Sequence, residues 1–119
     1  MKGYEIKNFN YSKEKKEESD IEKPFSVHVN AEATEKLAYG KVNVHVKYEL
    51  VNVTIFIEVD GFFEINDDEN EETVMKHLTV NGTAIVFPYI RSMVSMLTSL
   101  DSDAAVILPT INTTDFLSK

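Results

Sequence analysis

The chain has 119 residues, a length that predicts one domain over residues 1–119. Its 12 Lys and Arg against 20 Asp and Glu give a net charge of −8, which argues against binding nucleic acid or anionic lipid, because both need a basic surface. The absence of cysteine excludes disulfides, thiol chemistry and Cys-ligated zinc. The apolar runs are too short for a membrane span, and no signal-peptide pattern follows the first basic residues. We therefore expect a cytoplasmic protein without membrane insertion.

The first half of the chain has the patterns of β-strands. A short strand is expected around Tyr4–Tyr11, followed by a polar loop at residues 12–24. Period-two alternation of β-branched or aromatic residues then predicts half-buried strands at residues 25–31, 41–47 and 51–59. Asp60-Gly61 is typical of a tight turn, with a short return strand at residues 62–65. We predict four antiparallel strands with one continuous apolar face.

Helical patterns follow the strands. Asp67 or Asp68 could cap a short helix that ends at Asn81-Gly82. Pro88 suits the first turn of a second, longer helix. Apolar residues then recur at helical spacing up to a stop near residues 100–103: Ile90, Met93, Val94, Leu97 and Leu100. A sheet followed by helices predicts an α+β fold.

No catalytic motif is present, so we expect neither an enzyme nor a cofactor. His28 and His45 share a predicted outer sheet face, where Glu58 could be a third metal ligand; solvated polar side chains are the favoured interpretation, and no metal is predicted. Ser92, Ser95 and Ser99 have no histidine or acid in triad order. The acids at residues 67–72 could bind calcium, but they lack EF-hand spacing, and a helix-capping turn is favoured.

The chain also has more adaptable apolar surface than one long helix can cover. Met75, Met93 and Met96 fall on predicted helices, flanked by the aromatic residues Phe62, Phe63, Phe87 and Tyr89. Methionine and aromatic clusters suit varied apolar partners, although plain core packing is the alternative. Phe56 on the outer sheet face adds to this surplus. We expect burial between subunits or a binding surface.

Several spaced elements resemble the SecB export-chaperone family over about residues 41–116. The opening Phe-Pro-Tyr-Ile-Arg at residues 87–91 resembles the start of that family's long helix, and Leu-Pro-Thr-Ile-Asn at residues 108–112 resembles the stretch that ends its domain. Residues 55–59 and 61–63 look like its third and fourth strands, and residues 71–78 match its short helix. The family's last helix is long, whereas this chain ends shortly after Leu117.

The resemblance implies a SecB-like fold, with a four-stranded antiparallel sheet packed on one long helix plus a short helix. It implies a homo-oligomer, a tetramer formed as a dimer of dimers, with Ile57, Val59, Met93 and Leu97 at the interface. Phe87 and Tyr89 would line the groove for unfolded polypeptides. Phe56 and Glu58 would lie on the outer face that docks a SecA-type translocation motor.

The function expected from the resemblance is a chaperone that holds unfolded or export-bound polypeptides in apolar grooves without chemistry. A dedicated variant would bind one partner, as SecB-like chaperones attached to toxin–antitoxin pairs do. The alternative is an oligomeric structural or adaptor protein, for example of phage type, that keeps the fold but holds no clients.

Overall fold

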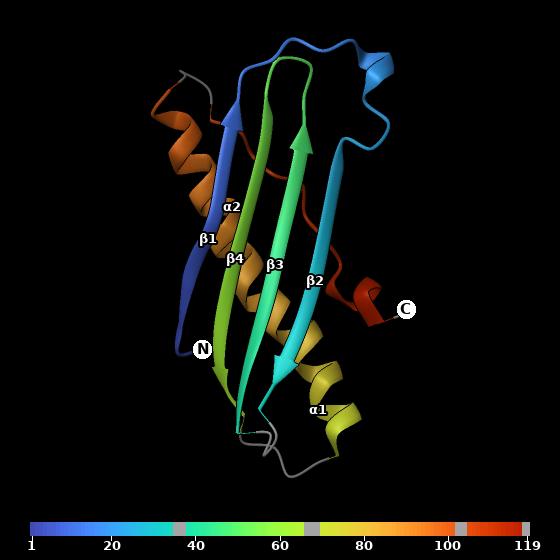
Figure 1. Cartoon of the computed structure of the whole chain (residues 1–119), viewed down its shortest axis with the longest axis vertical. Coiled ribbons are helices and arrows are strands. Elements are labelled where there is room, and N and C mark those ends of the chain that lie inside the picture. The colour runs from blue at the N-terminus through green and yellow to red at the C-terminus, as the bar shows by residue number, and fades with distance from the viewer. Residues whose placement is uncertain (35–37, 66–69, 102–104, 118–119) are drawn as a thin grey trace.

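Four antiparallel strands form one sheet in the computed structural model, which describes residues 1–34, 38–65, 70–101 and 105–117. The strands run in the order β1-β4-β3-β2, which confirms the predicted four-stranded antiparallel sheet. Their bounds are β1 Gly3–Ser12, β2 Phe25–Ala33, β3 Tyr39–Glu49 and β4 Thr54–Glu64. Because β1 and β2 lie at opposite edges, the polar loop between them must cross the whole end of the sheet (Figure 1).

The predicted alternation places one apolar face of the sheet in the core. Val44 pairs with Val59 and Val46 pairs with Ile57 across β3 and β4, and all four side chains are almost fully buried. The residues between them, such as His45 and Glu58, lie on the outer face and are half-buried. This face is polar because solvent covers it, whereas the helices cover the other one.

The expected turn at Asp60-Gly61 is wrong. β4 runs unbroken from Thr54 to Glu64, and Gly61 pairs with Val42 on one side and Tyr4 on the other. The glycine has a packing role instead, because a Cβ at Gly61 would collide with the Val86 side chain of the covering helix. The second strand of the β3–β4 hairpin is correspondingly longer than the sequence predicted.

The helices form one continuous rod. α1 (Glu71–His77) passes through a π-helical turn, η2 (Leu78–Gly82), directly into α2 (Thr83–Ser99). Asn70 caps the start, its side chain accepting a hydrogen bond from the Thr73 backbone N–H at 2.9 Å. The expected caps Asp67 and Asp68 lie outside the described residues.

Two expected helix boundaries are wrong. Gly82 does not end a helix, since its backbone angles are right-handed helical, φ −62° and ψ −45°, and its lack of a side chain lets the helix approach Val42 closely. Pro88 lies inside α2 rather than in a first turn. Pro88 and Ala84, whose carbonyl loses its helical donor there, are both exposed, so water can satisfy that carbonyl.

α2 crosses the sheet diagonally and covers its apolar face (Figure 1). Val86, Ile90 and Val94 of α2 are completely buried in the core with the valines and isoleucines of β3 and β4. The chain then runs back beside α2, where the Thr98 hydroxyl accepts a hydrogen bond from the Val106 N–H at 2.8 Å. Leu108 is buried in the same core, and a short 3-10 helix, η3 (Thr113–Leu117), follows.

Candidate functional site

The flank of α2 next to the edge strand β1 carries an exposed apolar stripe. Its members are separated by four, seven and four residues, which places them along one side of the helix: Ile85, Tyr89, Met96 and Leu100. Met96 is 62% exposed and Leu100 is 80% exposed. Ile107, from the segment that runs beside α2, is also exposed. Single exposed apolar residues are common on protein surfaces, but several of them in one contiguous run mark a candidate interaction surface.

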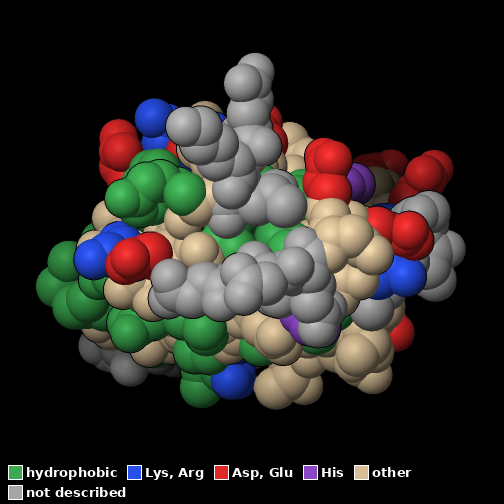
Figure 2. Space-filling view, turned by 90° about the horizontal axis from the view of Figure 1, so that it is seen from below, with side chains coloured by type: hydrophobic (Ala, Val, Ile, Leu, Met, Phe, Trp, Pro, Cys, Tyr) green, Lys and Arg blue, Asp and Glu red, His purple; other side chains and the backbone are tan. Residues whose placement is uncertain are grey.

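The edge strand β1 extends the stripe. Tyr4 stacks on Tyr89 with ring centroids 5.1 Å apart and an interplanar angle of 28°, and Ile6 of β1 is exposed as well. Hydrophobic side chains gather on the side of the molecule where β1 lies (Figure 2). We call the set Tyr4, Ile6, Ile85, Tyr89 and Met96 the α2 surface.

Two hollows lie where the C-terminal segment runs along α2. The first has a volume of about 410 Å³ and is lined by Phe87, Arg91 and residues 110–113, among others. Phe87 is only 4% exposed, so it contributes to the wall of the hollow while belonging mainly to the core. The second hollow, of about 670 Å³, is lined by Met96, Ile107 and the α2 serines Ser92, Ser95 and Ser99. Pro88 and Arg91 line both hollows.

Arg91 gives these hollows their polarity. It is the only charged residue among the described lining residues of either hollow, in a chain whose net charge is −8. Its Nε–H donates to the Leu108 carbonyl at 3.1 Å, which fastens the C-terminal segment to α2. A guanidinium has five N–H donors, so others can serve the carbonyls or carboxylate of a bound peptide.

The predicted docking face is on the other side of the sheet. Glu58 lies beside Asp60, and the Asn43 side-chain amide donates to both carboxylates, at 2.8 Å to Glu58 and 2.7 Å to Asp60. Phe56 is half-buried there and contacts His45 at a centroid distance of 5.9 Å. The outer face thus combines hydrogen-bonded polar side chains with the ring of Phe56.

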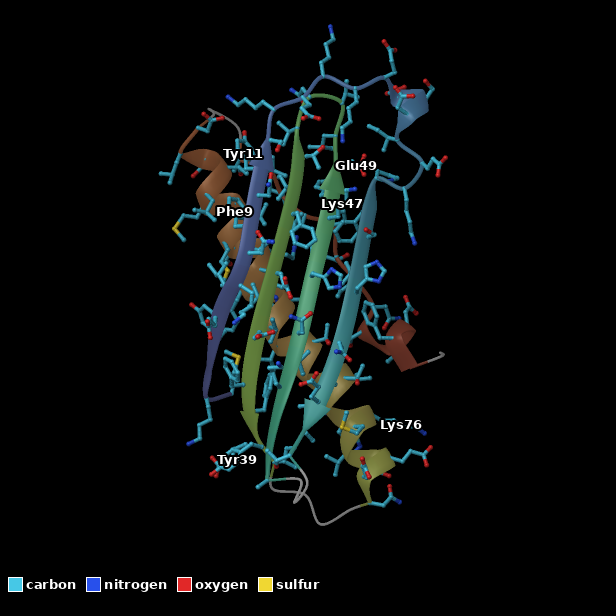
Figure 3. The ribbon with its side chains drawn as sticks, in the orientation of Figure 1. Phe9, Tyr11, Tyr39, Lys47, Glu49 and Lys76 are labelled. Atoms are coloured by element: carbon cyan, nitrogen blue, oxygen red, sulfur yellow. The ribbon has the colours of Figure 1, made fainter. Side chains whose placement is uncertain are left out.

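Charged pairs surround this outer face. Lys47 and Glu49 lie along the end of β3 (Figure 3) and form an ion pair of 3.0 Å. Hydrogen bonds from Lys47, and then from Lys16, hold the pKa of Glu49 below its ordinary value. The carboxylate therefore stays ionised to lower pH than a free glutamate.

The four residues expected at a subunit interface, Ile57, Val59, Met93 and Leu97, are buried or half-buried within the single chain. Ile57 and Val59 are 0% exposed within the single chain, because α2 and the neighbouring strands cover them, so they offer no surface to a second subunit. Met93 is also buried and Leu97 is half-buried. The exposed apolar side chains of the α2 surface include none of these four residues.

Sequence reasoning identified Phe87 and Tyr89 near the hollows and the stripe, but it missed Ile85, Arg91 and the pairing of Tyr4 with Tyr89. The recurrence of Ile85, Tyr89 and Met96 along one helix side was a usable signal. Within the described residues, no group of three or more His, Cys, Asp or Glu is arranged to hold a metal ion. No described helix is long and apolar enough to cross a membrane.

The architecture defines an α+β protein with the SecB-like fold. Residues covering 92% of this chain superpose on 88% of a Mycobacterium tuberculosis SecB-like chaperone (Rv1957), solved in complex with a ChAD peptide from the Rv1956 HigA1 antitoxin, with a TM-score of 0.65 and 13% identity. A protein of unknown function from Streptococcus agalactiae shares the fold with a TM-score of 0.54 and 14% identity, over 92% of this chain and 94% of that one. At these identities the likeness establishes the fold alone.

No family model matches the sequence. In sequence, the chain is 38% identical over 60 residues to the protein named "Uncharacterized protein MJ0357" from Methanocaldococcus jannaschii. The match covers 50% of this chain and 38% of that protein, so this chain spans well under half the length of the relative.

Proposed function

We propose that this chain is a SecB-like polypeptide-binding chaperone that holds an extended, mainly apolar segment without chemistry. The observation that carries the proposal is the exposed α2 surface, whose Met96 also lines the larger of the two hollows beside Arg91. The complex of the M. tuberculosis SecB-like chaperone with an antitoxin peptide supports a peptide as the ligand of this fold.

The surface suits extended chains for physical reasons. Methionine is unbranched and polarisable, so Met96 can adapt to different apolar side chains, and Tyr89 offers a flat aromatic face. Arg91 can donate to peptide carbonyls between the apolar contacts. Such contacts are individually weak and loosely shaped, which permits more than one client.

The client is either an unfolded, export-bound polypeptide or one dedicated partner, and we propose the general holdase as the first form to test. A homo-oligomer, formed as a dimer of dimers, belongs to the proposal because the resemblance to the SecB family implies one. The outer face with Phe56 and Glu58 is proposed as the docking face for a SecA-type motor, because it carries acidic groups and the Phe56 ring.

The alternative is an oligomeric adaptor without clients. The exposed α2 stripe favours it as well, because self-association could cover that stripe.

The test is a titration of a permanently unfolded polypeptide, and separately of short apolar peptides, into the protein, with its mass recorded by light scattering. Met96→Asp should weaken binding about tenfold or more, because burying one such side chain contributes about 1.5 kcal/mol or more. Tyr39→Ser is the matched control, since Tyr39 is exposed at the far end of β3 (Figure 3).

Each result selects one form of the proposal. Binding of unfolded chains that Met96→Asp weakens and Tyr39→Ser leaves unchanged supports a general holdase. Saturable binding of a single peptide supports the dedicated form. A well-folded oligomer that binds neither ligand would contradict the chaperone proposal and favour the adaptor.

A further inference from the structure

A pair of imidazoles lies on the outer face of the sheet, away from the α2 surface. His28 of β2 and His45 of β3 are directly opposite each other in the strand register. Their rings are stacked with centroids 4.9 Å apart and an interplanar angle of 23°. His28 is exposed and His45 is half-buried, so small solutes can reach the rings. The proposed peptide binding does not use either residue.

The spacing of the two rings fits coordination to one metal ion. An ion about 2.0–2.1 Å from one nitrogen of each ring would hold the two centroids about 4.6–5.3 Å apart, for ligand angles between about 90° and 110°. The observed separation of 4.9 Å falls inside that range. The rings would only have to turn about their Cβ–Cγ bonds until one nitrogen of each faces the ion, and that torsion is broad for histidine.

The surroundings favour a cation. Glu58 pairs with His45 in the register on its β4 side and contributes negative charge one strand away. The two lysines of β3 nearest the pair are engaged with carboxylates: Lys47 with Glu49 at 3.0 Å and Lys41 with Glu32 at 3.5 Å. These ion pairs reduce the repulsion that free ammonium groups would exert on a metal ion.

We propose that His28 and His45 form a two-imidazole site for a divalent transition-metal ion of the zinc, nickel and copper group. Imidazole nitrogen suits these ions, whereas magnesium and calcium prefer oxygen. The remaining coordination positions are filled by water, since the described part of the chain has no group of three or more candidate ligands. The site is therefore an open surface site.

Metal binding at this pair would fasten an edge of the sheet. β2 is an edge strand, and β3 is its neighbour in the sheet. An ion held by one histidine from each strand joins β2 to β3 through side chains as well as through the backbone ladder. Because the two rings are brought together only in the folded chain, the ion stabilises that state and raises the melting temperature.

The experiment titrates untagged protein with ZnCl₂ and, separately, NiCl₂, followed by calorimetry and by thermal unfolding. We expect one ion per chain and a rise in melting temperature. Loss of outer-shell partners of metal ligands already costs about 10–100-fold in affinity, so His28→Ala and His45→Ala should each weaken binding at least about tenfold. His77→Ala, at the end of α1, is the matched control and should bind as the wild type does. MgCl₂ should produce no effect.

A second measurement on the wild-type chain keeps the proposal open to refutation if a variant fails to fold. In NMR spectra of the imidazole nitrogens, zinc should shift the signals of His28 and His45 and leave those of His77 in place. Absence of zinc binding, binding that survives His28→Ala or His45→Ala, or a shift confined to His77 would each overturn the site. None of these outcomes bears on peptide binding at the α2 surface.

Discussion

Gly61 of β4 and Val86 of α2 lie so close together that no side chain fits between them. A Cβ built on Gly61 would collide with Val86 Cγ2, and it would also lie 3.2 Å from the Phe63 ring. Gly82 makes the same kind of contact from the helix side, where a Cβ would lie 2.7 Å from Val42 Cγ2. The rod of α1, η2 and α2 therefore rests on the sheet at glycine positions, and this close approach buries the valines around it.

Gly61→Ala should destabilise the fold, because the new methyl group must displace Val86 in a completely buried site. Overpacking of this kind typically costs about 1–3 kcal/mol. Gly3→Ala is the matched control, since nothing lies within 4 Å of a Cβ at that position of β1. Urea denaturation of the two variants measures the difference, and equal midpoints would contradict the packing role of Gly61.

Thr83→Val should stabilise the chain. Thr83 is completely buried, and among the described residues its hydroxyl is the one buried side-chain polar atom without a hydrogen-bond partner. Replacing the unsatisfied hydroxyl by a methyl group of similar size should raise the free energy of unfolding by about 1 kcal/mol. The measurement is thermal unfolding followed by circular dichroism.

Thr98→Val provides the opposite case on the same helix. The Thr98 hydroxyl donates to the Val94 carbonyl at 2.7 Å and accepts from the Val106 N–H at 2.8 Å, so its removal should lower stability. If both threonine variants lower the melting temperature, the assignment of Thr83 as unsatisfied is incorrect.

Asp101 should make folding pH-dependent. Hydrogen bonds from Lys13, at 2.6 Å, and then from Tyr11, at 3.0 Å, lower the pKa of Asp101 from its ordinary 3.8. Because the pKa of Asp101 is lower in the folded state, its ionised carboxylate contributes to stability at pH values above the ordinary pKa of 3.8. That contribution is lost as the pH falls through the pKa that Asp101 has in the folded state. The hydrogen bond to Asp101 raises the pKa of Lys13 from 10.5, so its contribution is present below 10.5 and is lost as the pH rises through the folded-state value.

Asp101→Asn should therefore lower the melting temperature at neutral pH, and the difference from the wild type should shrink as the solution is acidified below the ordinary aspartate pKa. The effect should be small, because Lys13 and Asp101 are both well exposed, and high salt should reduce it further. A difference that stays constant across the acid range would rule out the ionised carboxylate as its source.

Local patterns predicted the sheet well. The alternation around Val44 and Ile57 predicted strands because one side of a strand is buried and the other is not. The sequence could not distinguish the two uses of glycine, since Asp60-Gly61 has the composition of a turn while Gly61 is required by Val86, a residue 25 positions later. The boundary at Gly82 was misplaced for the same reason, because its close contact with Val42 comes from tertiary packing.

The sequence predicted the candidate site only in part. The helical spacing of Tyr89 and Met96 is visible in the sequence, but the stacking of Tyr4 on Tyr89 depends on β1 pairing with β4, a strand in the middle of the chain. The hydrogen bond from Arg91 to Leu108 likewise depends on how the C-terminal segment runs back along α2. Period and propensity describe neighbours in sequence, so contacts between distant segments lie beyond them.

Arg91→Ala should weaken peptide binding, because it removes the only charged group among the described residues that line the two hollows. Arg91→Lys keeps the charge but loses the planar set of donors, so its affinity should fall between the wild type and the alanine variant. Lys23→Ala is the matched control, since Lys23 is an exposed cation in the polar loop. Fluorescence anisotropy with a labelled apolar peptide measures all three, alongside thermal unfolding to account for the lost bond to Leu108. If Lys23→Ala and Arg91→Ala weaken binding equally, the peptide responds to net charge alone, and the hollows beside α2 are not where it binds.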